Sequence, residues 1–486
     1  MARALQHRPG LLGVGVDPMA IVRRIARYLG IAVLVVLCLI GAALVTTQTG
    51  WFKDYLRGVV ERQAAQYLNG TLSIQRLQGS VLTGIELDGV ALHHEGQTAV
   101  AIDKLFVAYE PITMIREGLI LRSLRLEGPT VLLQRDNAGW NFNRFVKTRK
   151  NTGGKGAPPL TIETLSVSNG HVIVKDRGAL VEDITSLNST LRFAYHKPGI
   201  EFDIAQLSGR SPDVNIKKLA GNLRFEGGAT QVGDLSVETD RSNFVTTFGW
   251  TGGTEPLARR TFDVTLHADR LSLPEVGLLF KPVAGINLAP ALDVKAHGPF
   301  SALKMDVNVV SSEGNAYGPL IGHFGTPAPG LEGTLTVSKI DLQHLVNRPE
   351  WKTRITGQTT FNWTFGHPTA VGAGQPMKVN FKFAGPEAEG FGYRAENVRA
   401  QGVYVAPDLK FDATGNGYGA AASARATFHF PASGPMTYAL AGNFSHLDMR
   451  RLPPSLAMPK LETVAAGQYQ FSSTGRDWRG SGTLSE

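Results

Sequence analysis

The sequence predicts a mostly β protein, in which an N-terminal transmembrane helix and an amphipathic helix precede an elongated, repetitive β-groove. Alternation of apolar and polar residues is the first reason, and it is clear in residues 262–267, 303–309, 361–365, 377–383 and 426–430. A period of two places all apolar side chains of a strand on one face. Glycine is the second reason, because 55 glycines in 486 residues exceed the average of about 7% and are typical of strands joined by tight turns.

A repeated unit is the third reason. Segments 269–276, 338–345 and 445–452, which we call hooks, share the spacing polar–x–apolar–x–apolar–x–x–apolar, and each follows an alternating strand. The next strand comes at a nearly constant distance of 21, 21 and 22 residues. Repeated strand–hook–strand units favour one long sheet over three unrelated domains. The pattern stops partway through a unit at 482–486, so we expect this chain to be part of a longer one.

An apolar, uncharged run occupies residues 29–45, and 46–47 extend it without charge. As a helix it covers roughly 26 Å, close to the ~30 Å hydrocarbon core of a bilayer. A cleaved signal peptide is the alternative, with an apolar region of about 7–15 residues and a small-residue cleavage site, which 41–43 resembles. The length favours a transmembrane anchor over 29–47, built from Leu29, Ile31, Val33, Leu34, Val35, Val36, Leu37, Leu39, Ile40, Leu44 and Val45.

Charges around this run predict its orientation. Five arginines, among them Arg23, Arg24 and Arg27, precede it with a single acid, Asp17. The basic side of a span stays in the cytoplasm, so residues 1–28 are predicted to form a basic cytoplasmic N-terminus and the large remainder to be exported. The only cysteine, Cys38, lies in the span, so the exported part contains no disulfide and no cysteine-based site.

An amphipathic helix of about five turns is predicted over 51–68. Its apolar stripe recurs at three- and four-residue steps and comprises Phe52, Tyr55, Leu56, Val59, Val60, Ala64, Tyr67 and Leu68. The helix covers one end of a core or closes the open end of an apolar sheet, and both arrangements bury this stripe.

Short strands follow this helix over 72–79, 80–92, 119–126 and 129–134, with a helical piece over 109–117 and a turn over 136–143. Residues 151–159 read as a linker or long loop because they combine glycine, lysine and proline. We therefore expect an N-terminal cap unit over 48–150 and a strand-rich body over 160–486.

The charge balance does not indicate nucleic-acid binding. The net charge is +8, but part of it is the arginine cluster and the rest is spread along strands without a basic run. A weak attraction to anionic lipid headgroups fits this distribution better.

Motifs for enzymatic chemistry are not evident in the sequence, and we predict no enzyme, no metal and no cofactor. A phosphate-binding Gly-x-x-x-x-Gly-Lys-Ser/Thr loop is absent. The glycine-rich segment 415–419 joins two alternating strands and is predicted to be a turn. His93 and His94 lack the spacing of a zinc helix and are expected in a loop. Asp136 and Asn143 are expected to stabilise a turn rather than to form a polar site.

Four passages carry a resemblance to a known family: the anchor with helix 51–68, residues 79–90, residues 124–143, and the hooks. In them the chain resembles the AsmA-like superfamily, most closely its TamB family of inner-membrane subunits of translocation and assembly modules. The resemblance implies a single-pass inner-membrane protein with its large part in the periplasm of a Gram-negative bacterium. It also implies a chorein-like cap and a U-shaped, taco-like β-groove with a hydrophobic interior. The C-terminal region by which that family reaches the outer membrane is absent.

Function follows as an expectation from this resemblance: phospholipid passage between the inner and outer membranes, with an outer-membrane barrel partner of the TamA type. A diacyl lipid exposes on the order of 30 CH₂ groups in water, at about 0.8 kcal/mol each, and an apolar trough removes most of this cost. We expect the trough to be lined by Val264, Leu266, Met305, Val307, Val309, Phe361, Trp363, Phe365, Val379, Phe381, Phe383, Phe428 and Phe430.

Two further hypotheses remain open. A scaffold for insertion of outer-membrane β-barrel proteins or autotransporters would use strand edges to pair with nascent strands. A plain β-sandwich or β-helix adhesin would instead fill the apolar face with its own side chains.

Overall fold

The computed structural model describes Val35 and residues 49–485, except 81–83, 110–118, 138, 146, 148–158, 197–198, 254, 280–282, 346, 348, 367–375, 391, 432, 453–460 and 476. The predicted anchor, apart from Val35, lies outside the described residues, as do the basic N-terminus, most of the helical piece 109–117 and most of the linker 151–159. In the described part of the chain, no helix combines the length and the apolar character that crossing a membrane requires.

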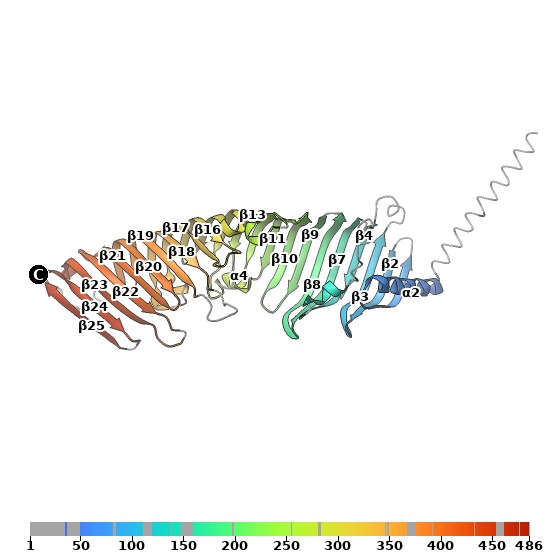
Figure 1. Cartoon of the computed structure of the whole chain (residues 1–486), viewed down its shortest axis with the longest axis horizontal. Coiled ribbons are helices and arrows are strands. Elements are labelled where there is room, and N and C mark those ends of the chain that lie inside the picture. Colours follow the sequence, from blue (N-terminus) through green and yellow to red (C-terminus); the bar gives the residue numbers. More distant parts are fainter. Residues whose placement is uncertain are drawn as a thin grey trace, which may run out of the picture.

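The described chain forms one long, mostly antiparallel sheet of 25 strands, and the molecule is elongated along the direction in which the strands stack (Figure 1). The predicted mostly β class is therefore confirmed. The strands are β1 (Thr71–Ser80), β2 (Gly84–His94), β3 (Gln97–Tyr109), β4 (Leu119–Glu127), β5 (Thr130–Asp136), β6 (Gly139–Trp140), β7 (Leu160–Asp176), β8 (Ala179–His196), β9 (Gly199–Arg210), β10 (Asn215–Glu226), β11 (Ala229–Thr239), β12 (Asn243–Thr251), β13 (Thr261–Arg270), β14 (Ala291–Pro299), β15 (Leu303–Ser311), β16 (Gly314–His323), β17 (Gly330–Ile340), β18 (Thr353–Thr364), β19 (Lys378–Gly390), β20 (Tyr393–Val405), β21 (Asp408–Gly417), β22 (Ala420–His429), β23 (Thr437–Asp448), β24 (Val464–Ser473) and β25 (Trp478–Ser485).

In the described part of the chain, one long helix precedes the strands and the other helical segments are short. The described ones are α2 (Gly50–Tyr67), α4 (Leu273–Leu279), α5 (Leu342–Leu345) and the 3₁₀ turns η1 (Asn141–Arg144), η2 (Leu257–Arg259), η4 (Phe300–Ala302), η5 (Pro349–Trp351) and η6 (Met449–Arg451).

Neighbouring strands from β7 to β25 pair antiparallel in chain order, and several of them are joined by tight turns, as the glycine content predicts. The predicted turn over 415–419 is confirmed at 418–419, whereas residues 415–417 belong to β21: Gly417 pairs with Ala420, and Tyr418 and Gly419 connect them with φ angles of 55° and 86°. Two consecutive residues with positive φ are the geometry of a tight type I′ hairpin, which glycine adopts without steric cost.

The sheet continues without a break between the predicted cap and body. Strands β4 and β5 lie end to end between β3 and β7, since both pair antiparallel with β3 and parallel with β7. Gly128, with φ of 59°, and Pro129 separate them. The predicted turn after β5 is organised by Asn141, whose side-chain amide accepts from Gln134 N and donates to Leu132 O.

Helix α2 confirms the amphipathic helix predicted over 51–68. Leu56 and Val60 pack against the cluster formed by Ile74, Leu77, Leu87 and Val90 on β1 and β2. The carboxylate of Glu61 accepts from Ile74 N at 2.9 Å, and the Arg57 guanidinium donates to Gln75 O at 2.9 Å. These bonds satisfy backbone groups of the first strand, so α2 both covers the apolar face and blocks the sheet edge at this end. Tyr55 was assigned to the buried stripe incorrectly, because it is 56% exposed.

The three predicted hooks occupy equivalent places, at the ends of β13, β17 and β23. Ser272, Asp341 and Asp448 each stand directly before the short helix α4, α5 or η6. Asp341 Oδ1 accepts from Gln343 N at 3.0 Å, and Asp448 Oδ1 accepts from Arg450 N at 3.1 Å, as helix-capping carboxylates do.

Hydrogen bonds to Glu275 hold the first hook in place. Glu275 on α4 accepts hydrogen bonds from the hydroxyls of Thr239, at 2.8 Å, and Ser242, at 2.5 Å, and Ser242 is only 2% exposed. Because these are charge-assisted bonds in a buried place, α4 is fixed to the connection between β11 and β12.

Candidate functional site

The register of the sheet aligns one apolar residue or glycine from β3, from β4 and from each strand between β7 and β25 into a single row along the molecule. Adjacent members are direct cross-strand partners and therefore point to the same face. With neighbouring strands ~4.8 Å apart, the row extends roughly 95 Å. Its members are Tyr109, Leu121, Ile162, Phe193, Phe202, Leu223, Val232, Phe248, Val264, Ala296, Met305, Leu320, Gly333, Phe361, Phe381, Gly402, Phe411, Ala426, Leu440, Phe471 and Gly480. We call this series the central row.

The thirteen residues predicted to line a trough all have the orientation of this row. Val264, Met305, Phe361 and Phe381 belong to the row itself. Trp363, Val379 and Phe428 lie on one side of it, linked through their pairing with Leu331, Tyr404 and Leu409. Leu266, Val307, Val309 and Phe383 lie on the other side. Phe365 and Phe430 come directly after β18 and β22.

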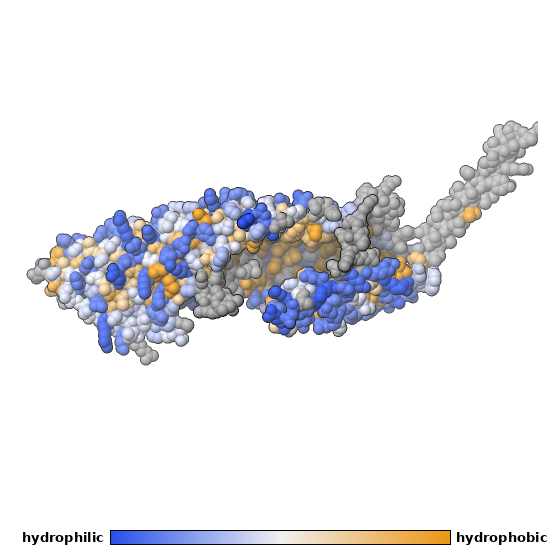
Figure 2. Space-filling view, viewed as in Figure 1, coloured by the Kyte–Doolittle hydropathy of each residue, from blue (hydrophilic) through white to orange (hydrophobic). Residues whose placement is uncertain are grey.

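Most of these apolar side chains are half-buried, whereas the residues between them are exposed. In β19, Val379, Phe381 and Phe383 are half-buried while Lys378, Asn380 and Lys382 are exposed. In Figure 2 the surface over β7 to β11 is hollowed, and the floor of the hollow is hydrophobic. An apolar face that is neither covered by a second sheet nor flat against water can hold an apolar ligand.

Small residues form part of this face, and sequence reasoning missed them because it followed only large alternating side chains. Gly402 stands between Phe381 and Phe411 in the central row, and Ala426 follows. In the next row, Tyr469 lies across Gly442 and donates from its hydroxyl to Ser423 O at 2.8 Å. Burial raises the pKa of Tyr469. A large ring packs over the glycine of the neighbouring strand, where no side chain is in its way. In the sequence, such a position could have been recognised as a glycine that stands where the alternation calls for an apolar residue.

A cavity of about 830 Å³ opens on this face at the C-terminal end of the described sheet. Its lining combines small residues such as Ala413, Ala422 and Ala424 with larger ones such as Phe444 and Met449.

The connection that follows hook 338–345 packs on the apolar face. The segment between β17 and β18 carries Trp351 to β22, where its ring centroid lies 5.7 Å from those of both Phe428 and Phe430. Trp351 is 9% exposed and Ala426 beneath it is 1% exposed. Phe428 and Phe430, predicted to line a trough, therefore pack against Trp351 of this connection.

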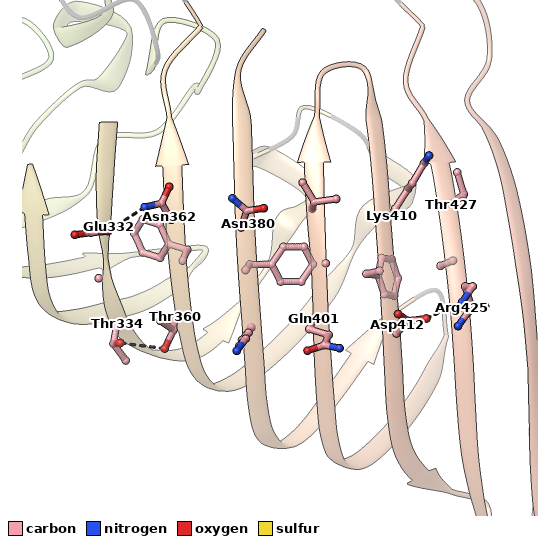
Figure 3. A pocket seen from close by; sticks show the side chains of 18 of the residues that line it. Glu332, Thr334, Thr360, Asn362, Asn380, Gln401, Lys410, Asp412, Arg425 and Thr427 are labelled. Atoms are coloured by element: carbon pink, nitrogen blue, oxygen red, sulfur yellow. Dashed lines mark hydrogen bonds and ion pairs between the residues drawn. The ribbon is translucent and has the colours of Figure 1, made fainter. Parts of the chain in front are cut away.

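The opposite face carries polar side chains in equally regular rows. Figure 3 shows a hollow of about 1010 Å³ where these rows run side by side. Asn362 donates to Glu332 at 2.9 Å, the hydroxyls of Thr334 and Thr360 lie 3.0 Å apart, and Arg425 donates to Asp412 at 2.9 Å. The sheet thus separates a hydrated face from an apolar one.

Titratable pairs lie on this hydrated face. Nε2 of His323 lies 3.0 Å from Glu332, and Nδ1 lies 3.0 Å from Ser301 O. The hydrogen bond with Glu332 raises the pKa of His323, while the bonds from His323 and Asn362 lower the pKa of Glu332. Asp293, 2.6 Å from Nδ1, likewise raises the pKa of His267.

We expect the His323–Glu332 pair to stabilise the sheet in a limited pH window. The contribution of His323 is fully present below the ordinary histidine pKa near 6.5 and is lost as pH rises through the raised pKa. The contribution of Glu332 is present above its ordinary pKa and is lost as pH falls through the lowered one. His323→Gln should therefore reduce the melting temperature more at pH 6 than at pH 8.5, by an equivalent of about 1 kcal/mol or less because the pair is partly exposed. An equal effect at both pH values in thermal unfolding would contradict this assignment.

The other polar candidates from the sequence are not brought together. His93 and His94 belong to strand β2, so the expectation of a loop was wrong. Asp136 pairs with Arg144 at 2.7 Å and helps to hold the turn. Among the described residues, no group of three or more His, Cys, Asp or Glu side chains is placed to hold a metal ion.

Comparison of the chain with family models, with curated proteins and with solved structures finds no match.

Proposed function

We propose that the protein is a membrane-anchored conduit that carries phospholipid along the apolar face of its sheet, between the inner and outer membranes of a Gram-negative bacterium. The observation that supports this most directly is the central row, whose members on β4 and on every strand from β7 to β25 are apolar residues or glycine. Over these strands a ligand that moves along the row meets no polar side chain, and Tyr109 on β3 is the member that carries a hydroxyl.

The energy of acyl chains gives the row its significance. Transfer of the roughly 30 CH₂ groups of a diacyl lipid from a bilayer to water costs more than about 20 kcal/mol of free energy. A trough that is U-shaped in section and surrounds the acyl chains removes most of this cost, while the headgroup stays hydrated at the open side. The interaction is non-directional, so a lipid can slide from one strand to the next without breaking specific bonds.

Trp363 adds a polar group at a suitable place. Its Nε1 is buried and has no hydrogen-bond partner among the described residues. Buried donors without a partner are rare and costly. The ester carbonyl of a glycerolipid is an acceptor of the right kind for an indole N–H that lies beside an apolar row.

The resemblance to the TamB family supports the location and partners of this conduit. We propose a single span over 29–47, exported residues in the periplasm, and an outer-membrane barrel of the TamA type at the far end. Helix α2 closes one end of the sheet by packing Leu56 and Val60 on its apolar face, so lipid enters from the open side beyond α2 rather than along the axis.

Photocrosslinking tests this proposal directly. A photoreactive amino acid at Phe381 or Trp363 should capture phospholipid in cells, detected by mass spectrometry of the purified adduct. The same group at the neighbouring positions Asn380 and Asn362, on the hydrated face, is the matched control and should capture little. Capture of protein alone from Phe381 and Trp363, or equal lipid from both faces, would remove the support for a conduit.

A further inference from the structure

Helix α2 carries an aromatic pair on the side that faces away from the sheet. Leu56 and Val60 point to the apolar face of β1 and β2, whereas Trp51 is 73% and Tyr55 is 56% exposed. The two rings stack with centroids 6.2 Å apart and planes inclined by 15°. No strand or hook in the described part of the chain covers them, although Trp is among the side chains most strongly driven out of water.

The position of the pair in the chain indicates what covers it. Residue 48 alone separates the predicted anchor 29–47 from Thr49, whose hydroxyl accepts from Phe52 N at the start of α2. Farther along the same side of the helix, Arg62 and Gln66 are exposed and polar. The aromatic part is therefore confined to the first turns, next to the apolar run.

We propose that Trp51 and Tyr55 form an interfacial anchor that inserts into the lipid headgroup region of the exported leaflet. Both rings combine an apolar body with a hydrogen-bonding tip and are enriched at the boundary between hydrocarbon and water. A second protein would be an alternative occupant, but continuity with the predicted span favours the bilayer. The proposal rests on the membrane-anchored conduit above, and it places the closed end of the sheet against the membrane surface.

Depth-resolved fluorescence quenching tests this anchor in the full chain. The protein is reconstituted into phosphatidylcholine–phosphatidylglycerol vesicles that contain dibrominated phospholipid, which quenches indoles in contact with it. The chain has six tryptophans, so the conservative variant Trp51→Phe removes one indole and leaves five that still report. We expect the bromolipid to quench Trp51 in the unmodified protein. Trp51→Phe should therefore lower the fraction of the tryptophan fluorescence that the bromolipid quenches.

A second variant separates the two proposals. A fall in the quenched fraction in Trp363→Phe indicates that Trp363 contacts lipid inside the trough. A fall in Trp51→Phe indicates that Trp51 contacts lipid at the membrane surface. An unchanged quenched fraction in Trp51→Phe overturns the interfacial anchor, whatever Trp363→Phe gives. Loss of quenching in Trp51→Phe together with no change in Trp363→Phe supports the anchor and counts against the conduit.

Discussion

Phe381→Asp should reduce lipid transfer by on the order of tenfold or more while leaving the sheet folded. Phe381 lies in the central row between Phe361 and Gly402. These two cross-strand partners carry no basic group, so a carboxylate at this point is unpaired in the row, and its desolvation by passing acyl chains costs several kcal/mol. Each 1.4 kcal/mol added to the barrier is a factor of ten in rate. Transfer of labelled phospholipid between donor and acceptor vesicles measures the effect.

Asn380→Asp is the matched control, because it adds the same carboxylate one residue away on the exposed face of the same strand. It should transfer lipid at the rate of the unmodified protein. Equal loss in both variants would indicate a general effect of charge or folding and would contradict transport along the central row.

The same pair of variants separates the conduit from an assembly scaffold for outer-membrane β-barrel proteins or autotransporters. A scaffold that pairs with nascent strands uses backbone N–H and C=O groups at a strand edge, and β19 is an interior strand with partners on both sides. If the protein is an assembly scaffold, Phe381→Asp should therefore leave barrel assembly intact. If it is a lipid conduit, the same variant should block lipid delivery.

Gly402→Ala should destabilise β19 to β21 by about 1–3 kcal/mol, as overpacking of a filled site does. A Cβ at Gly402 would lie 2.4 Å from Lys410 O and 2.5 Å from Phe411 Cβ. Neither atom belongs to the far end of a flexible side chain, so the strands themselves must separate. In a cooperative unit of 150–250 residues this corresponds to a fall in melting temperature of about 2–4 °C per kcal/mol.

Gly285→Ala is the control for this change, because a Cβ there meets nothing within 4 Å. Hydrogen exchange should show faster opening of β20 and β21 in Gly402→Ala and no change in Gly285→Ala. Unaltered exchange in both variants would mean that the interlocked glycine and ring are not needed to hold these strands.

The thirteen predicted lining residues show how many residues of the site could be assigned to the correct face of the sheet from the alternation of apolar and polar residues alone. A period of two fixes the face of every residue in a strand, since successive side chains point in opposite directions. Val264, Phe361 and Phe381 could therefore be assigned to one face without knowledge of their neighbours. The alternation could not tell that Gly402 and Ala426 belong to the same row, because small residues give no hydrophobic signal and their place depends on the partner strand.

The sequence by itself determined that this is a β protein with strands of one apolar and one polar face, a helix before them, and hooks at regular intervals. These properties depend on local spacing and turn chemistry. Only the tertiary structure decided the register that joins the apolar faces of separate strands, and the path of Trp351 across the face to Phe428. Register depends on hydrogen bonds between strands and on bulges, such as those beside Lys339 and His446, where φ is 56° and 58°. A bulge bends its strand and shifts every later pairing by one residue, and this long-range geometry is not contained in the spacing of any single segment.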